Sequence, residues 1–450
     1  MPFTRYSFNT NPGPWSIKEH VLVTISANSG AIGNLAWTPI SLAQLYYGDK
    51  IPAAVCLFFM WAIVWLGYSL AVLARQFLLY DPLYQWPQSL MQANLFETFR
   101  KSSEDSKVGR KQKHVFFWLV LGVTLWQFLP EFVFPFLSSL SFLCWVAPRN
   151  PIANFMGAGL GGMGFLNFSL DWSTISTQWG NPLINPFWVS VVLFAAYVLN
   201  CWILLPAAKW GNLGEWHHQL MSNRLFLANG TRYPVTKLIG PNHTLNQTAY
   251  EQLGPLHMGT QELWSLFFDY ASYTSAFTWC LLFGSPQIKT TVRKLIERIK
   301  SRGKVGVNTQ FNDRLNVIMR SYKEVPMWWY ITLFMCHFII IITILSCGYF
   351  YIPIWTYFIA LLTGFVVVVP MSWLFAISNF QVAIGSFNEL LYGYMVNAGS
   401  GHRHPAGAST YGSIAGDAWY RAQYMLQDQK IGHYMHVSTS IRWNHTRMPC

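Results

Sequence analysis

Charged residues are scarce in this 450-residue chain, in which Asp, Glu, Lys and Arg together make up 11%, against roughly 25% in ordinary soluble domains. They are missing altogether from residues 325–388, a run of 64 residues. A soluble core does not hold such a run, because its connecting loops must face water. A bilayer takes roughly 20 apolar residues per helix. The run therefore predicts two transmembrane helices, Met327–Ser346 and Tyr351–Trp373, joined by a short turn at Cys347–Phe350, and part of a third segment.

Several functional signatures are also missing. The seven cysteines form no CxxC pair and most lie in apolar runs, so we interpret them as small hydrophobic residues rather than disulfide partners or metal ligands. Residues 1–15 are polar and lack the apolar stretch of a cleavable signal peptide. The glycines at 157–164 are not followed by GKS or GKT, which argues against a nucleotide site. The missing motifs disfavour an ATP-driven pump, and the cysteine pattern disfavours a cysteine-based metal site.

Apolar segments of membrane-spanning length occur along the rest of the chain. They are Ile51–Leu73, His114–Leu137, Pro186–Ala208 and Leu263–Phe283. Val21–Tyr47 is weakly apolar and rich in small polar residues, which is typical of a helix packed inside a bundle; Ser16 is its predicted N-cap. The sequence thus predicts an all-α fold: a polytopic transmembrane helical bundle with broken or re-entrant helices, forming one membrane-embedded domain over residues 1–450.

The net charge of +12 lies mostly in loops, which favours contact with anionic lipids over nucleic acid. Loop 74–113 carries seven Lys/Arg, and loop 284–324 carries ten against three acids, so both are predicted to be cytosolic. Loop 209–262 has four Lys/Arg in 54 residues and three candidate glycosylation sequons, at Asn229, Asn242 and Asn246. It is predicted to be extracytosolic.

The segment Phe375–Ala398 is helical in pattern but interrupted by Gly385 and Gly393, with Asn388 and Glu389 at its centre. Residues 399–450 carry five Lys/Arg against two acids, a mild excess that places them inside. Both ends of the segment would then lie on one side, which predicts a re-entrant hairpin. An ordinary crossing is the alternative, because the charge rule is weak for so few residues.

Polar side chains at membrane depth are costly and usually face a partner or a watered path. Each also has a structural explanation: Glu131 fits an interfacial position, Asp171 a helix cap, and His337 a satisfied core histidine. Interrupted helices near the bilayer midplane indicate a transporter's binding site. The candidates for a substrate or proton path are Glu131, Asp171, Asn388, Glu389 and Tyr392.

Several motifs resemble the oligopeptide transporter family, in its fungal and plant peptide-transporter branch. The resemblance begins with NPGPWSIKEHVLVTISANSGA at 11–31, which includes the motif residues Asn11, Pro12, Gly13, Lys18, Glu19 and His20. It continues with QFLPEFVFPFLSSLSFLCW at 127–145, GLGGMGFLNFSLDWSTIS at 159–176, NPLINPFW at 181–188, YKEVPMWWY at 322–330, FNELLYGY at 387–394 and QKIGHYM at 429–435. The motifs cover nearly the whole chain in the family's order.

The resemblance implies a proton-coupled importer of small peptides, about three to five residues long, in the plasma membrane or an internal membrane. Some relatives handle glutathione or metal chelates, and the family implies neither ATP nor a bound cofactor. Members carry further sequence before NPG, and after GHYM a KIPPR motif and more spans. Here residues 436–450 depart from the family. The resemblance therefore implies a chain truncated at both ends, and an inactive fragment is one alternative.

A membrane-embedded enzyme is a third hypothesis, for example an acyltransferase that uses His337 or His20. It is disfavoured because no nucleophile and base occur at a recognisable spacing. The sequence thus predicts a non-enzymatic secondary transporter.

Overall fold

The computed structural model describes residues 16–437 apart from 104–106, 160, 177–180, 182–183, 212–215, 217, 241–244, 287, 291–292, 294–295, 297–310, 323–324, 383–385 and 398–403. Helices make up almost all of its regular structure. The described strands form two antiparallel pairs of two residues each, β1 (Leu140–Ser141) with β2 (Asn167–Phe168) and β3 (Leu225–Phe226) with β4 (His257–Met258). The predicted all-α class is confirmed.

The helices follow one another along the chain with few long connections. The first half holds α1 (Ile17–Ala31), α2 (Trp37–Ser41), η1 (Leu42–Tyr46), α3 (Ala53–Leu70), α4 (Val72–Leu78), α5 (Pro87–Ser103), α6 (Lys107–Phe128), η2 (Leu129–Val133), η3 (Pro135–Ser138), α7 (Phe142–Val146), α8 (Pro151–Gly157), α9 (Trp172–Ser176), α10 (Phe187–Tyr197), η4 (Val198–Leu204) and α11 (Leu205–Trp210). The second half holds η5 (Val235–Leu238), α12 (Gln247–Leu253), α13 (Thr260–Phe283), α15 (Arg314–Met319), α16 (Met327–Ser346), η8 (Tyr349–Tyr351), α17 (Ile354–Ser378), α18 (Ser386–Asn397) and α19 (Ala406–Tyr434).

Five of the described helical segments are long and apolar enough to cross a membrane: Ala53–Arg75, Lys107–Val133, Phe187–Trp210, Met327–Ser346 and Ile354–Ser378. Each of these segments overlaps a predicted span, and most of the observed ends lie within a few residues of the predicted ends. Leu263–Phe283 also forms one continuous helix, α13. The chain is therefore a multi-pass membrane protein. The interruption predicted after His114–Leu137 is present as well, because α6 ends at Phe128 and a π-helical turn takes in Pro130 and Glu131.

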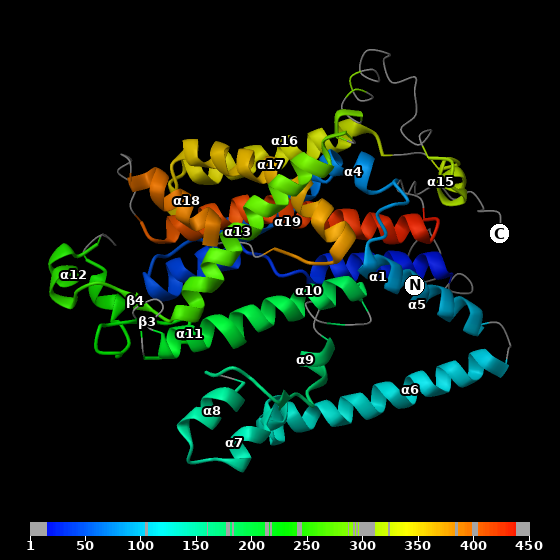
Figure 1. Cartoon of the computed structure of the whole chain (residues 1–450). Coiled ribbons are helices and arrows are strands. Elements are labelled where there is room, and N and C mark those ends of the chain that lie inside the picture. Colours follow the sequence, from blue (N-terminus) through cyan, green and yellow to red (C-terminus); the bar gives the residue numbers. More distant parts are fainter. Residues whose placement is uncertain are drawn as a thin grey trace, which may run out of the picture.

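The helix α19 lies at the centre of the bundle, and sequence analysis did not predict it. It packs along α17, α3, α18 and α5, and Figure 1 shows it between α16 and α17 on one side and α1 on the other. Most of its 29 residues are buried, including Tyr411, Asp417, Trp419 and Arg421. The expected cytosolic position of residues 399–450 is corrected for 406–434, which form the core of the bundle.

Small residues allow α19 to approach its neighbours closely. A Cβ atom on Gly67 of α3 would lie 2.6 Å from both the Cβ of Arg421 and the carbonyl oxygen of Asp417. A Cβ atom on Gly364 of α17 would lie 2.7 Å from the Cβ of Ala418. Inside a bilayer the hydrophobic effect does not drive helices together, so they associate through close packing of small residues such as these.

Two clusters of contacts define the ends of the bundle. At the Tyr351 end, the ring of His404 stacks on Tyr351 with centroids 3.8 Å apart, just before α19 begins. At the Asn316 end, where α19 finishes, His433 Nε2 lies 3.0 Å from Asn316 Oδ1, and Lys430 Nζ donates to the Leu79 carbonyl at 2.7 Å. α19 therefore runs the length of the bundle, and the QKIGHYM motif holds one end of it in place.

The re-entrant hairpin expected at Phe375–Ala398 is wrong. Phe375, in the last turn of α17, packs on Trp86 near the Asn316 end, whereas Tyr392 of α18 donates to the Tyr351 carbonyl at 3.4 Å. The segment thus runs back along the bundle as an interrupted crossing, which was the alternative. The charge count misled because four of the seven charges counted after Ala398, those of Asp417, Arg421, Asp428 and Lys430, belong to α19.

Candidate functional site

The first helix of the bundle is interrupted close to α19. α1 begins at Ile17, and its N-cap is Ser16, as predicted; the side chains of Ser16 and Glu19 form a capping box. The helix ends at Ala31, and α2 begins only at Trp37. We call the non-helical stretch between them, Ile32–Ala36, the α1–α2 break. It leaves backbone carbonyl and amide groups without helical partners, and these groups need partners inside a membrane protein.

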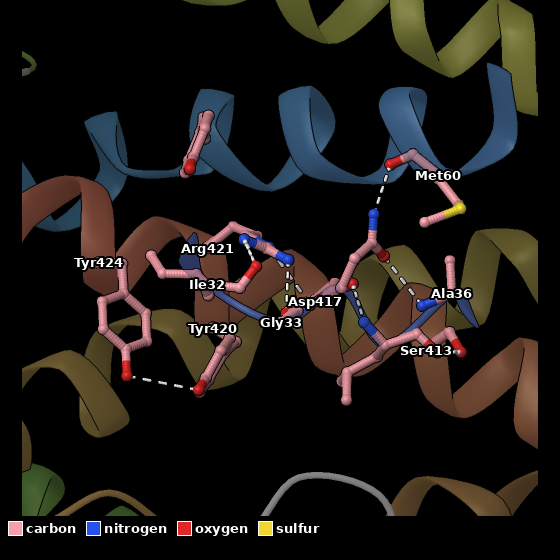
Figure 2. A network of polar contacts seen from close by, with 12 residues as sticks. Ile32, Gly33, Ala36, Met60, Ser413, Asp417, Tyr420, Arg421 and Tyr424 are labelled. Atoms are coloured by element: carbon pink, nitrogen blue, oxygen red, sulfur yellow. Dashed lines mark hydrogen bonds and ion pairs between the residues drawn. The ribbon is translucent and has the colours of Figure 1, made fainter. Parts of the chain in front are cut away.

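Side chains of α19 supply those partners. Arg421 donates to the Gly33 carbonyl at 2.7 Å and to the Ile32 carbonyl at 3.3 Å. Asp417 Oδ2 accepts from the Leu35 amide at 3.1 Å. Figure 2 shows Arg421, Asp417 and Ser413 in a row on α19, facing the break. The break is therefore held open by fixed contacts.

The break is also fixed from the side of α3. The side-chain amide of Asn34 donates to the Met60 carbonyl at 2.9 Å, and its oxygen accepts from the Ala36 amide at 2.9 Å. Ser413 of α19 donates to the Leu35 carbonyl at 3.0 Å. Because both neighbouring helices hold it, the interruption is a stable feature of the fold.

Asp417 and Arg421 form a buried ion pair one helical turn apart. Their side chains are 0% and 1% exposed, and Arg421 Nε lies 3.4 Å from Asp417 Oδ1. The guanidinium also lies at the C-terminal end of α1, where the helix dipole favours positive charge. Each charge of the pair is placed beside the other and bonds to the backbone of the break, so we interpret the pair as structural: it stabilises the interrupted helix inside the bundle.

A polar cavity of about 310 Å³ opens beside the break. α1, the break, the start of α5 and α19 contribute its walls. Its lining residues are Asn28, Ala31, Ile32, Gly33, Gln88, Tyr420, Tyr424, Gln427 and Asp428. Amides and hydroxyls dominate this set, and both kinds of group can donate and accept hydrogen bonds. The cavity is therefore suited to a ligand with many amide groups.

A second interruption lies next to this cavity. α17 ends at Ser378, and its C-cap Asn379 adopts a left-handed conformation with φ of 58° and donates to Asn185 Oδ1 at 3.1 Å. Gln381, two residues further on, accepts from the hydroxyl of the cavity residue Tyr424 at 3.4 Å. Tyr420 in turn donates to Tyr424 at 3.3 Å. The cavity thus lies where two interrupted helices meet α19.

Two of the predicted path residues lie together, away from this cavity. Gln127 bridges them, because its amide donates to Glu131 at 3.1 Å and to Asp171 at 2.7 Å. Asp171 also accepts from the Ser173 amide and hydroxyl. The hydrogen bonds from Gln127 and Ser173 hold the pKa of Asp171 well below its ordinary value. Asp171 therefore stays charged and caps α9, while Glu131 is exposed.

The three predicted residues of α18 are brought to its contact with α19. Asn388 and Tyr392 are buried at 5% and 3% exposure. The ring of Tyr392 packs 5.5 Å from that of Tyr411. Glu389 is exposed overall, but its side chain lies against Gly412 of α19. These residues face α19 nearer to the Tyr351 end than the polar cavity does.

The remaining predicted residues lie at the surface or outside the described part. Lys18 donates to the Tyr322 hydroxyl at 3.2 Å, and His20 is exposed. Asn229 lies in an exposed turn, and Asn246 caps α12. Asn11, Pro12, Gly13 and Asn242 lie outside the described residues.

The cavity residues on α19 were missed by sequence analysis. Tyr420, Tyr424, Gln427 and Asp428 recur every three or four residues and so share one face of the helix. That spacing was available in the sequence. It was overlooked because the segment is too polar to be recognised as a membrane helix.

Comparison with known proteins identifies the family. The model of the family described as OPT oligopeptide transporter protein matches residues 1–441. The chain belongs to the OPT family. It is 32% identical over 342 residues to Oligopeptide transporter 8 of Arabidopsis thaliana, which covers 76% of this chain and 45% of that protein. It is 28% identical over 447 residues to Oligopeptide transporter 5 of the same plant, covering 97% and 57% respectively.

The chain spans about half the length of these OPT relatives. No solved structure matches it. The interrupted helices, the polar cavity and the central helix α19 all lie within the stretch that the OPT family model matches. The site is therefore built from family sequence.

Proposed function

We propose that this chain acts in the proton-coupled transport of small oligopeptides, about three to five residues long, across a membrane. The observation that carries the proposal is the polar cavity bounded by the α1–α2 break and α19. Membership of the OPT family, whose relatives are named oligopeptide transporters, supports the same substrate class.

The cavity chemistry favours peptides over most other small solutes. A peptide presents alternating amide donors and carbonyl acceptors. Asn28, Gln88 and Gln427 present side chains of the same kind. The side-chain oxygens of Gln88 and Gln427 are buried without a hydrogen-bond partner in the described structure, and such groups are costly until a ligand satisfies them. The volume also lies within the ordinary range for ligand pockets, about 300–1,000 Å³.

Proton coupling requires a carboxylate that can bind and release a proton during transport. Glu131 and Glu389 remain our candidates, with Asp171, Asn388 and Tyr392 beside them in the proposed path. The side-chain amide of Gln127 donates to both Glu131 and Asp171. Protonation of one carboxylate would therefore change the hydrogen bond that the amide makes to the other. Glu389 lies on α18, beyond the second interruption.

Uptake of a radiolabelled tetrapeptide by cells expressing this chain tests the proposal. We expect acid-driven uptake that unlabelled tetrapeptide abolishes, and that Gln427→Leu lowers at unchanged surface expression. The control is Gln247→Leu, on the surface helix α12, which should transport normally. Competition by glutathione rather than by tetrapeptide would reassign the substrate. Absence of peptide uptake and of peptide binding would overturn the proposal.

The proton step is tested separately. Glu131→Gln and Glu389→Gln each neutralise a candidate with little change of shape. Substitution of the coupling residue should remove the dependence of uptake on a pH gradient. Exchange of peptide across the membrane in the absence of a gradient should continue. Unchanged gradient-driven uptake in both variants would eliminate both residues.

A further inference from the structure

A second cavity of about 390 Å³ lies between α1, α3, α16 and α19 and adjoins the polar one at Asp428. Its walls are almost entirely apolar, with Leu22, Trp65, Trp329 and Leu333 among them. Asp428 lines both this cavity and the polar cavity. It is therefore the residue at which an apolar space and an amide-lined space meet.

Asp428 is a buried carboxylate, 5% exposed. Among the residues that the structure describes, none donates a hydrogen bond to it or pairs with it as a cation. Its neighbour Lys430 points elsewhere and donates to the Leu79 carbonyl. In the described lining of the two cavities Asp428 is also the one side chain that carries a formal charge. A buried carboxylate in this position requires a cation or a proton.

We propose that Asp428 binds the amino group of a peptide's first residue, whose side chain enters the apolar cavity while the following peptide bonds lie in the polar cavity. This inference rests on the proposed peptide transport and adds to it a substrate class: peptides with a free amino terminus and a bulky apolar first residue.

The arrangement matches the branching of a peptide at its first residue. The amino group, the side chain and the start of the backbone all leave one Cα atom, and the carboxylate, the apolar cavity and the amide-lined cavity meet at one residue of α19. Burial of a large aliphatic or aromatic side chain in the apolar cavity stabilises the complex through the hydrophobic effect. The carboxylate adds a charge-assisted hydrogen bond to the ammonium group.

Equilibrium binding to the purified chain in lipid nanodiscs tests the inference without requiring transport. The probes are Leu-Ala-Ala, Gly-Ala-Ala and N-acetyl-Leu-Ala-Ala. We expect Leu-Ala-Ala to bind about tenfold or more tightly than either of the others, in keeping with the loss of a charge-assisted hydrogen bond or of a buried side chain. Asp428→Asn should bring its affinity down to that of the acetylated peptide.

Two variants separate the parts of the site. Leu333→Ala enlarges the apolar cavity and should lower the preference for Leu over Gly at the first position, while the preference for a free amine persists. Asp269→Asn, an isosteric loss of one charge on α13 outside both cavities, is the matched control and should behave as the unmodified chain.

The outcomes distinguish this inference from the proposal beneath it. If the three peptides bind to the unmodified chain with equal affinity, or Asp428→Asn leaves the preferences unchanged, the assignment of Asp428 is wrong and peptide binding stands. If no peptide binds, the proposed function itself is wrong, and this inference fails with it.

Discussion

Arg421 makes two hydrogen bonds to the α1–α2 break, whereas its partner Asp417 accepts one, from the Leu35 amide. The arginine also pairs with that carboxylate. Arg421→Met therefore leaves a buried negative charge without its cation and two carbonyls without donors, whereas Asp417→Asn leaves the arginine bonded to the break. We expect Arg421→Met to lower the free energy of unfolding by about 3–5 kcal/mol, and Asp417→Asn by clearly less. Unfolding transitions in detergent measure both, and equal losses would contradict the asymmetry.

Asp171 provides a pH-dependent test at the residue scale. Its pKa is lowered in the folded chain, so the charged carboxylate stabilises the fold above the ordinary aspartate value of 3.8, and this contribution is lost as the pH falls below it. The melting temperature of Asp171→Asn should lie below that of the unmodified chain by a constant amount between about pH 5 and 8. The difference should shrink in more acidic buffer. A difference that grows on acidification would show that the carboxylate is not held in its charged form.

The close packing of helices on α19 is the feature to test at the scale of elements. Gly67→Ala places a Cβ atom 2.6 Å from the backbone oxygen of Asp417, so α3 or α19 must shift. We expect a loss of about 1–3 kcal/mol in the free energy of unfolding. Gly122→Ala on the exposed helix α6 meets no atom within 4 Å and should be neutral or stabilising, by at most about 1 kcal/mol, through helix propensity. Equal effects of the two variants would remove the evidence for close packing.

The elements that sequence analysis identified are those whose environment is uniform. Met327–Ser346 was predicted to the residue because a long apolar run between Pro326 and Cys347 has one stable form in a bilayer. The helix α19 was not predicted, because other helices surround it and its residues suit packing and hydrogen bonding rather than contact with lipid. The site depends on α19, and for that reason the candidate residues chosen from sequence, such as Glu131, lie away from the cavity.

At the scale of the whole molecule, the two ends of the bundle differ in what they carry. Figure 1 shows the sequon-bearing segment with α12 at the same end as the turn between α16 and α17, and α15 of the basic loop at the other end. The positive-inside rule then predicts one orientation for the whole bundle, with the basic loop in the cytosol. The sequons at Asn229 and Asn246 and the turn should share one side of the membrane.

Two native cysteines test that orientation. Cys336 and Cys347 are both exposed, but Cys336 lies in the middle of the membrane-spanning helix α16 and so is expected to face lipid, whereas Cys347 lies in the turn after that helix. A charged, membrane-impermeant maleimide added outside intact cells, to a chain carrying Cys450→Ser, should label Cys347 and leave Cys336 unmodified, because a charged reagent does not enter the apolar phase of the bilayer. Cys347→Ser should abolish the labelling. In the same preparation, enzymatic deglycosylation should increase the gel mobility of the chain, and Asn229→Gln with Asn246→Gln should reduce or remove that shift. Labelling of Cys347 only after the membrane is permeabilised would reverse the proposed orientation.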